Sequence, residues 1–233
     1  MEDKYLILGD GALGTELYKQ TGWKVISRKK NGFDITILDS YENLIEPDRT
    51  VINVIGYTNT YDISKKMSLE INYVAFMKLV NLCQARGNKL VHISSDYIYA
   101  NSAKNCRYEN DVPVHAQNWY SYSKLLSDAY IQAIMSNYLL IRTSFKPRPF
   151  PYPSATDALV GNFDYIDVIA SLIIRLIDAG ARGIFNVGTK TKTIHDLAVQ
   201  SRPDVIKTHK LYYKTMPGTV EMSLGKMEKF LNG

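Results

Sequence analysis

The sequence is poor in the residues that build disulfide and metal frameworks. Its 233 residues include two cysteines and four histidines. Cys83 and Cys106 lack a metal-type spacing, and so do His115, His195 and His209, which predicts no metal site. A domain of this length buries roughly 70% of its unfolded surface and needs neither device for stability. We therefore expect a reduced, cytoplasmic protein.

Long apolar runs are also missing. No stretch reaches the roughly 18 apolar residues that a membrane-spanning helix needs, and charged residues precede Tyr5–Leu8 without the apolar region of a signal peptide. No membrane partner is expected. The net charge is +5, but only Arg28-Lys29-Lys30 forms a tight basic run, and no Gly/aromatic RNA motif accompanies it. The basic excess suits small phosphorylated ligands, and nucleic-acid binding is not expected.

Proline is scarce except in one place. Four of the eight prolines fall within Lys146–Pro153. Such a segment predicts a stiff stretch without regular secondary structure, which connects one region of the chain to the next. We expect a larger core over residues 1–145 and a small ligand-binding region over 146–233, interleaved with the core as a single unit.

The remaining sequence alternates between short apolar runs and longer segments with helical spacing. The runs typical of buried strands are Tyr5–Leu8, Lys24–Ser27, Val51–Ile55, Leu90–Ile93, Tyr138–Arg142 and Ile184–Val187. The segments typical of helices are Leu13–Gln20, Leu69–Arg86, Tyr120–Met135 and Tyr165–Ala179. This alternation predicts an α/β protein with a Rossmann-type, doubly wound parallel sheet covered on both faces. Ligands bind such sheets at the carboxyl ends of the strands, where the strand order reverses.

A glycine-rich turn joins the first expected strand to the first expected helix. Gly9 permits a tight turn, Gly11 lets the backbone approach a pyrophosphate, and Gly14 lets the helix pack on the strand. The intervening Ala12 and Leu13 open a helix whose N-terminus faces the anion. The pattern predicts a dinucleotide site, and a purely structural turn is the alternative.

The end of the second expected strand indicates which nicotinamide cofactor is bound. An NAD site usually has a carboxylate there for the ribose 2′-hydroxyl, but this strand runs into Ser27 and Arg28. Arginine forms charge-assisted bonds with a 2′-phosphate, so NADP(H) is favoured over NAD. A basic surface turn is the alternative. Asp39 and Ser40 are placed to meet the adenine edge, although turn residues would look the same.

Tyr120 and Lys124 carry the clearest chemical signal. They are four residues apart at the start of a long helix, so both project from one face. A ketone reductase needs an acid to protonate the alkoxide as hydride arrives, and a nearby ammonium would lower the pKa of a phenol toward that task. Lys124 can also hold the nicotinamide ribose.

A hydroxyl at the end of the fourth expected strand completes the set. Ser95 can hydrogen-bond a substrate carbonyl and orient it toward the phenol. The alternative is that Ser94 and Ser95 only satisfy backbone groups at the strand end. His92 alternates into the strand core, where packing is the simplest interpretation.

These motifs, in this order, resemble the extended short-chain dehydrogenase/reductases, and among them the dTDP-4-dehydrorhamnose reductases and related nucleotide-sugar 4-ketoreductases. The likeness extends over most of residues 4–188 and is weak in the last 45. The resembling segments are Gly9–Gly14, Asn53–Gly56, Asn72, Ser94–Tyr99, Glu109 with Asp111, Tyr120–Lys124, Arg142–Phe145, Asp164–Ala170 and Gly183–Gly188.

The resemblance implies an NADPH-dependent reductase of a 4-keto-6-deoxy sugar nucleotide in deoxysugar biosynthesis, with Ser95, Tyr120 and Lys124 catalytic and a homodimer possible. It adds Val54, Ile55 and Gly56 to the cofactor site. The substrate-binding residues that it implies are Asp96, Tyr97, Phe145, Lys146 and Arg148. For Lys146 and Arg148, a sugar-nucleotide diphosphate and simple surface solvation are equally good explanations.

Departures from the family pattern limit this interpretation. The Asp-Glu pair of the dehydratases is absent because Tyr97 follows Asp96, so water elimination is not expected. Cys106 lies too far downstream for the proton abstraction of epimerase-reductases, and Phe145 stands where reductases commonly have Trp. The chain is also short for the family. The alternatives are a non-catalytic NADP-binding regulatory subunit of the same fold and a nucleotide-sugar epimerase.

Overall fold

The computed structural model describes residues 4–61, 64–101, 108–109 and 118–233. Cys106, Asp111 and His115 lie outside this described part. The strands are β1 Tyr5–Leu8, β2 Lys24–Ile26, β3 Thr50–Asn53, β4 Lys89–Ile93, β5 Tyr138–Arg142, β6 Phe145–Lys146, β7 Ser154–Thr156, β8 Val160–Gly161, β9 Asp164–Tyr165, β10 Gly183–Asn186, β11 Lys192–Thr193, β12 Ile206–Thr208 and β13 Thr219–Val220. The helices are α1 Ala12–Thr21, α2 Arg28–Asn31, α3 Lys65–Leu69, α4 Phe76–Ala85, α5 Trp119–Ile134, α6 Ile166–Asp178, α7 Ile194–Ala198 and α8 Gly225–Asn232.

Six strands form the central sheet in the order β10-β5-β4-β3-β1-β2, and every neighbouring pair is parallel. The chain moves outward from β1 to β2 and then returns to β3 on the other side of β1. The strand order therefore reverses between β1 and β3, which is where ligands bind in doubly wound sheets. The predicted fold class is confirmed, and each of the six predicted strands is present with its ends shifted by no more than two residues.

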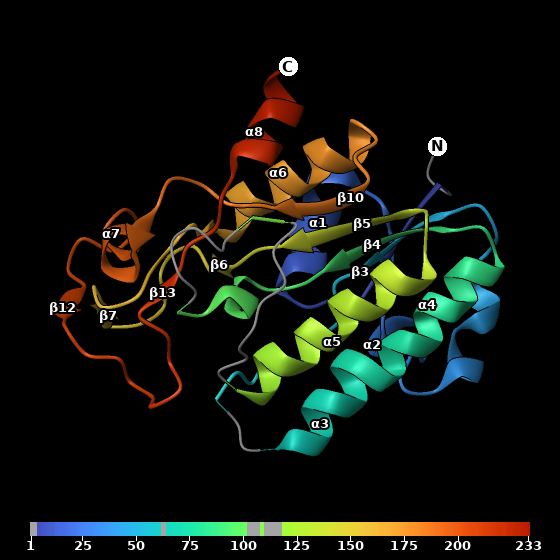
Figure 1. The fold of residues 1–233 in the computed structure, drawn as a ribbon, viewed down its shortest axis with the longest axis horizontal. Coiled ribbons are helices and arrows are strands. Elements are labelled where there is room, and N and C mark those ends of the chain that lie inside the picture. The colour runs from blue at the N-terminus through green and yellow to red at the C-terminus, as the bar shows by residue number, and fades with distance from the viewer. Residues whose placement is uncertain (1–3, 62–63, 102–107, 110–117) are drawn as a thin grey trace.

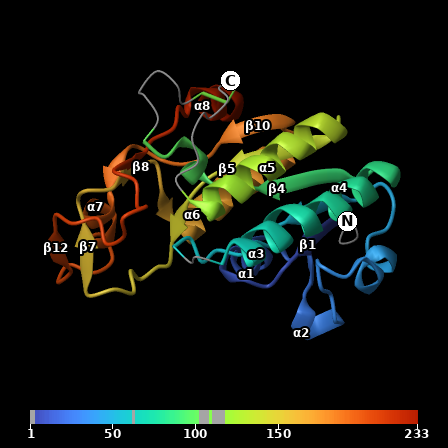
Figure 2. The ribbon, with the colours of Figure 1, turned by 60° about the horizontal axis from the view of Figure 1, so that its bottom comes forward.

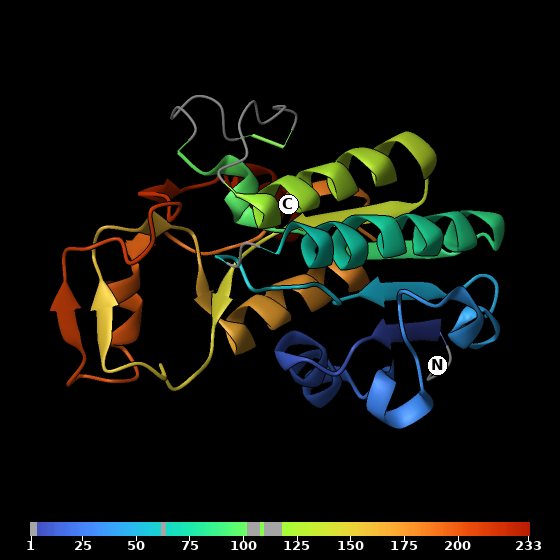
Figure 3. The same cartoon turned by 90° about the horizontal axis from the view of Figure 1, so that it is seen from below.

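Alternating side chains divide the core into two layers. Leu6, Leu8 and Leu90 point into one layer, where α4 supplies Phe76 and α5 supplies Ile131. Neighbouring residues on the same strands, including Ile7 and Val91, point into the other layer, which α1, α6 and α8 cover. Figure 3 shows α4 and α5 on one side of the sheet and α1 and α6 on the other. This two-sided burial explains why the strands are almost continuously apolar.

The second predicted helix, 69–86, begins earlier than expected and is not regular. It starts at Lys65, passes through a π-helical segment at Glu70–Ala75 and continues as α4. The wider turn brings Asn72 inward, where its amide oxygen accepts from the Tyr57 N–H at 2.7 Å and its Nδ2 donates to Ser123 Oγ at 3.0 Å. Asn72 thus joins the segment after β3 to α5, and π-bulges of this kind often occur at functional sites.

Residues after 145 build a smaller lobe and also complete the sheet. The lobe contains α7 and short strands around a separate core that includes Phe163, Tyr165 and Leu197, and it lies at one end of the molecule (Figure 1 and Figure 2). In contrast, β10 is the outermost strand of the central sheet and α6 covers one of its faces. The boundary at 145/146 remains a prediction. The proline-rich segment has no helix or strand between Pro147 and Pro153, as expected.

Within the described ranges, no helix is long and apolar enough to cross a membrane. Among the same residues, no group of three or more His, Cys, Asp or Glu side chains is placed to hold a metal ion. Cys83 is a buried free thiol on α4 and points into the core layer that this helix covers.

Candidate active site

Two adjoining cavities lie at the carboxyl ends of the central strands. The first, here called the glycine-side cavity, has a volume of about 330 Å³ and is bordered by the segments after β1, β2 and β3. The second, the tyrosine-side cavity, measures about 440 Å³ and is bordered by the segments after β3, β4 and β5 and by the start of α5. Both are lined by Gly11, Val54, Ile55 and Gly56. Together they run along the sheet edge where the strand order reverses.

The turn after β1 needs glycine at two positions. Gly9 has φ +106°, a conformation that side chains strongly disfavour. A Cβ on Gly14 would lie 2.1 Å from the Gly9 carbonyl oxygen, so only glycine lets α1 pack this close to the turn. Gly11, the N-cap of α1, makes no side-chain cap and has open space where a Cβ would point. The first backbone N–H groups of α1 therefore face the cavities without a capping side chain.

Arg28 reaches the glycine-side cavity together with an acid that the sequence analysis missed. Ser27 caps α2, and Arg28 Nη2 lies 2.6 Å from Asp34 Oδ2. Burial alone would raise the pKa of Asp34, but hydrogen bonds from Thr36 and the Arg28 guanidinium hold that pKa below its ordinary value. The expectation that no carboxylate would face this part of the site is wrong, because the chain turns back after α2 and brings Asp34 beside Arg28.

Asp39 and Ser40 are not among the residues that line the glycine-side cavity. They belong to a 3-10 helix, Leu38–Ser40. Ser40 instead supports the segment that does line it, since its Oγ accepts from the Asp34 N–H at 2.9 Å. The predicted contact of Asp39 with an adenine edge therefore has no cavity behind it, and Asp34 with Ile35 takes that place.

Ser95, Tyr120 and Lys124 all line the tyrosine-side cavity, as the sequence pattern predicts. Ser95 ends the segment after β4, where its Oγ caps the next turn by accepting from the Tyr97 N–H at 3.1 Å. Tyr120 and Lys124 occupy the first turns of α5, and Asn118 fixes the start of that helix with a capping box. Strand β4 and helix α5 are thus the two elements that bring the three side chains together.

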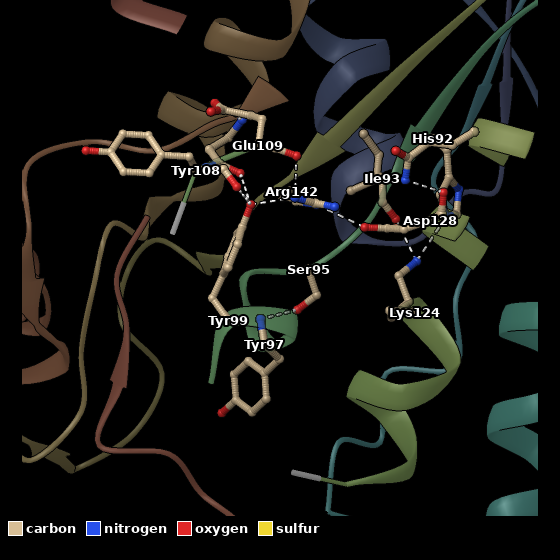
Figure 4. A network of polar contacts seen from close by, with 12 residues as sticks. His92, Ile93, Ser95, Tyr97, Tyr99, Tyr108, Glu109, Lys124, Asp128 and Arg142 are labelled. Atoms are coloured by element: carbon tan, nitrogen blue, oxygen red, sulfur yellow. Dashed lines mark hydrogen bonds and ion pairs between the residues drawn. The ribbon is translucent and has the colours of Figure 1, made fainter. Parts of the chain in front are cut away.

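The electrostatics of the phenol differ from expectation. Burial raises the pKa of Tyr120 to about 12, with a smaller opposing effect from the Ser95 hydroxyl and further increases from Asp96 and Asp128. The prediction that Lys124 lowers this pKa is wrong for this arrangement. The Lys124 Nζ is directed elsewhere, donating to the Ile93 carbonyl at 2.7 Å (Figure 4).

Asp96 and Lys146 place opposite charges at the far wall of the same cavity. Burial raises the pKa of Asp96 to about 7, against the lowering effect of Lys146 and of hydrogen bonds from neighbouring hydroxyls. Asp96 Oδ1 accepts from Ser95 Oγ at 3.3 Å, while Oδ2 has no hydrogen-bond partner in the described chain. Phe145 and Tyr97 line the cavity beside them. A wall of this kind can hold a polar, hydroxyl-bearing ligand.

Arg148 is the one predicted substrate residue that lines neither cavity. Its guanidinium pairs with Asp167 at 3.2 Å and lies 4.2 Å from the centre of the Tyr165 ring. In contrast, Tyr61 was not predicted, yet it borders the tyrosine-side cavity, and its hydroxyl lies 2.5 Å from the Tyr97 hydroxyl.

A buried ion pair fixes helix α5 next to the candidate site. Arg142 Nε lies 3.0 Å from Asp128 Oδ2, and both side chains are almost fully buried. Arg142 also donates to the Tyr99 hydroxyl at 2.5 Å, which links β5 to the turn after β4 (Figure 4). Asp128 lies one turn beyond Lys124 on α5. The pair therefore fixes the helix that carries the two candidate catalytic residues.

The sequence also matches a known protein family. The model of one family, described as the RmlD substrate binding domain, matches residues 3–146. The chain belongs to this family.

Relatives of the RmlD-family chain share modest sequence identity. A dTDP-4-dehydrorhamnose reductase of Mycobacterium tuberculosis is 24% identical over 211 residues, which cover 78% of this chain and 68% of the relative. The spore coat polysaccharide biosynthesis protein SpsK of Bacillus subtilis is 29% identical over 151 residues, covering 61% of this chain and 53% of the relative.

Solved structures share the fold over nearly the whole chain. A dTDP-4-dehydrorhamnose reductase of Clostridium acetobutylicum superposes with a TM-score of 0.83 at 22% identity, covering 98% of this chain and 92% of that one. A reductase of the same name from Bacillus anthracis, solved in complex with NADP, gives a TM-score of 0.83 at 18% identity, with 98% and 93% coverage. The 92–93% coverage shows that this RmlD-family chain retains the architecture of these longer relatives.

Proposed function

We propose that this RmlD-family chain is an NADPH-dependent reductase of a 4-keto-6-deoxy sugar nucleotide, of the dTDP-4-dehydrorhamnose reductase type. One observation carries the proposal: Ser95, Tyr120 and Lys124 line a single cavity that adjoins the glycine-rich turn. The curated relatives named as dTDP-4-dehydrorhamnose reductases support the same substrate class. A role for the chain in deoxysugar biosynthesis follows.

The residues at the glycine-side cavity fit a dinucleotide. A Cβ at Gly14 would collide with the turn, and the uncapped N-terminus of α1 offers backbone N–H groups to a pyrophosphate. Gly9, Gly11, Ala12 and Leu13 would hold that group. Ser27 and Arg28 would hold a 2′-phosphate, and the remaining cofactor contacts would come from Val54, Ile55 and Gly56. The relative from Bacillus anthracis that was solved with NADP supports this choice of cofactor.

Each of the three catalytic candidates has a distinct role in the proposed reaction. Bound NADPH supplies the hydride that reduces the keto carbon. The Ser95 hydroxyl polarises the substrate carbonyl and orients its oxygen. Tyr120 donates its phenolic proton to that oxygen as negative charge develops there. Lys124 holds the nicotinamide ribose and takes part in restoring the Tyr120 proton.

Asp96, Tyr97, Phe145 and Lys146 would surround the sugar, because they line the cavity around the reacting groups. Arg148 does not belong to this set, because it pairs with Asp167 and lines neither cavity. No acid follows Asp96 in the position that water elimination needs, which favours simple reduction over dehydration.

Turnover with a keto-sugar panel tests the proposal. Purified protein is mixed with NADPH and a set of 4-keto-6-deoxy sugar nucleotides, and the loss of nicotinamide absorbance is followed. Oxidation of NADPH by at least one dTDP-linked member is expected. Absence of turnover, together with stoichiometric NADPH binding, would contradict catalysis and indicate the non-catalytic NADP-binding subunit. Retention of a tightly bound cofactor through purification would instead indicate an epimerase.

A further inference from the structure

His92 lies directly behind Lys124, and its two ring nitrogens contact different partners. Nδ1 lies 3.1 Å from Asn53 Nδ2, and Nε2 lies 3.3 Å from Lys124 Nζ. The imidazole is fully enclosed and stacks on Phe76 at 3.9 Å between ring centres. Figure 4 shows His92 and Lys124 pointing toward one another from β4 and α5.

The hydrogen bonds around Asn53 determine which nitrogen of His92 carries a proton. Asn53 Oδ1 accepts from the Ile55 N–H at 3.1 Å, so the amide NH₂ must face the imidazole. Nδ1 of His92 is then an acceptor. Burial holds the pKa of His92 well below its ordinary value, so the ring is neutral and has a single N–H. That N–H is on Nε2.

The Nε2–H points at Lys124 Nζ. An ammonium has three donors and no acceptor, so it would face this N–H donor to donor. A neutral amine has a lone pair that can accept the Nε2–H while it still donates to the Ile93 carbonyl at 2.7 Å. Only the amine form satisfies every contact from Ile55 through Asn53 and His92 to Ile93.

We propose that His92 is a positioning residue that presents its Nε2–H to Lys124 Nζ and thereby favours the amine form of Lys124 over the ammonium. Lys124 can then exchange its proton close to neutral pH, where an ordinary lysine keeps it. This inference rests on the proposed reductase function, in which Lys124 helps to restore the Tyr120 proton. It assigns a chemical role to a histidine that the sequence pattern explains by packing alone.

Other influences around Lys124 shift its pKa in both directions. Burial lowers the pKa of Lys124 to about 8, and the Asp128 carboxylate on the same helix opposes that shift. Asp128 also forms an ion pair with Arg142 from β5, and this pairing weakens the stabilisation that Asp128 gives to a Lys124 ammonium. The remaining titratable groups lining the tyrosine-side cavity are Tyr61, Asp96, Tyr97, Tyr120 and Lys146. His92 is the nearby group that specifically penalises a donor at Nζ.

The tautomer of His92 tests the proposal without using turnover. Nitrogen NMR of protein labelled in its four histidines separates protonated from unprotonated ring nitrogens. We expect one histidine whose Nε2 carries hydrogen and whose Nδ1 does not, in the absence and in the presence of NADPH. The signal that disappears in His92→Asn is that of His92. If His92→Asn does not fold, a variant in which the other three histidines are replaced leaves only the His92 signal and gives the same assignment. A proton on Nδ1 would overturn the proposal.

Titration of Lys124 gives a second test. The Nζ signal, assigned by its loss in Lys124→Met, is followed against pH in the parent and in His92→Asn, which keeps an amide near Asn53 but cannot reach Nζ. In His92→Asn we expect the titration midpoint of Lys124 to rise by about one pH unit. In His92→Gln it should rise at least as far, because the glutamine oxygen can accept a hydrogen bond from the ammonium. The matched control His195→Asn, outside both cavities, leaves the midpoint unchanged.

The pH profile of turnover connects this behaviour to the reaction. In His92→Asn, the part of the pH profile that reflects titration of Lys124 should shift to higher pH together with the Nζ midpoint. A merely structural role of His92 would instead lower activity equally at every pH. An unchanged or lower Nζ midpoint would overturn the proposal. Failure of the parent to reduce any keto sugar would contradict the proposed function but leave the tautomer and the titration measurable.

Discussion

Arg28 and Asp34 form an ion pair with a 2.6 Å contact at the edge of the glycine-side cavity. The two side chains would act in opposite ways on a cofactor. A guanidinium attracts a 2′-phosphate, whereas a carboxylate repels it and instead accepts from a ribose hydroxyl. Because Arg28 is exposed to solvent and Asp34 is largely shielded, Arg28 is free to turn toward a phosphate while Asp34 remains held by Thr36.

Replacing Arg28 should reduce the preference for NADPH. A charge-assisted hydrogen bond contributes roughly 1.5–3 kcal/mol, and solvent exposure places this contact at the low end. We expect Arg28→Ala to weaken NADPH binding about tenfold and to leave NADH binding nearly unchanged, as measured by calorimetry with each cofactor. Lys30→Ala is the matched control, since Lys30 belongs to the same short helix but does not line the cavity. Equal affinities for the two cofactors in the parent would contradict the assignment of NADP(H).

Replacing Asp34 should act in the opposite direction. Asp34→Asn removes the charge that repels a 2′-phosphate and keeps a side chain able to bond Thr36. NADPH should bind tighter by roughly two- to fivefold, the effect typical of a partly exposed charge pair, while NADH should bind more weakly. Fluorescence titration with both cofactors measures the change. Weaker NADPH binding would show that Asp34 supports the cofactor rather than opposing it.

Asp96 should make the stability of the protein depend on pH. Its pKa is raised by burial to about 7, so the folded state binds a proton that the unfolded state has already released between roughly pH 4 and 7. Stability must therefore fall as pH rises through that window. Asp96→Asn cannot ionise, and above pH 7 it should be more stable than the parent by roughly 2–4 kcal/mol. Urea unfolding at several pH values tests this difference, and a constant difference from pH 4 to 8 would contradict it.

The Asp128–Arg142 pair should be costly to break from one side. Removing one partner of a buried ion pair leaves the other charge unpaired and typically costs about 3–5 kcal/mol. We expect Asp128→Ala to lower the free energy of unfolding by that amount. The double variant Asp128→Leu with Arg142→Met, which leaves no charge behind, should lose less. A double variant at least as unstable as the single one, in the same urea experiment, would show that the hydrogen bonds of Arg142 matter more than its charge.

The sequence predicted the sheet well because its information is local. Apolar runs separated by helical spacing are sufficient for β1 to β5 and β10, and the positions of Gly9, Gly11 and Gly14 directly indicate a tight strand-to-helix turn. The placement of the three catalytic candidates in one cavity was also predictable, since a strand-end serine and a Tyr–Lys pair on one helix face must meet at the same sheet edge.

The missed residues depend on contacts that sequence spacing does not encode. Asp34 reaches Arg28 only because α2 ends at Asn31 and the chain turns back after Gly32. Arg148 was assigned to the substrate, but Asp167, distant in sequence, holds it away. The polar contacts of His92 join three separate elements, so its position in an apolar strand indicated packing alone. A histidine two residues before the strand-end serines was the available signal.

The most direct test of the account is the reduction rate of Tyr120→Phe beside that of Tyr122→Phe. Both changes remove one hydroxyl from the same turn of α5, but Tyr122 is exposed and does not line the tyrosine-side cavity. With a keto sugar that the parent reduces, Tyr120→Phe should lower turnover by about 100- to 10,000-fold while folding and NADPH affinity stay close to the parent. Tyr122→Phe should retain normal turnover. Near-normal turnover in Tyr120→Phe would contradict the central claim that this phenol delivers the proton.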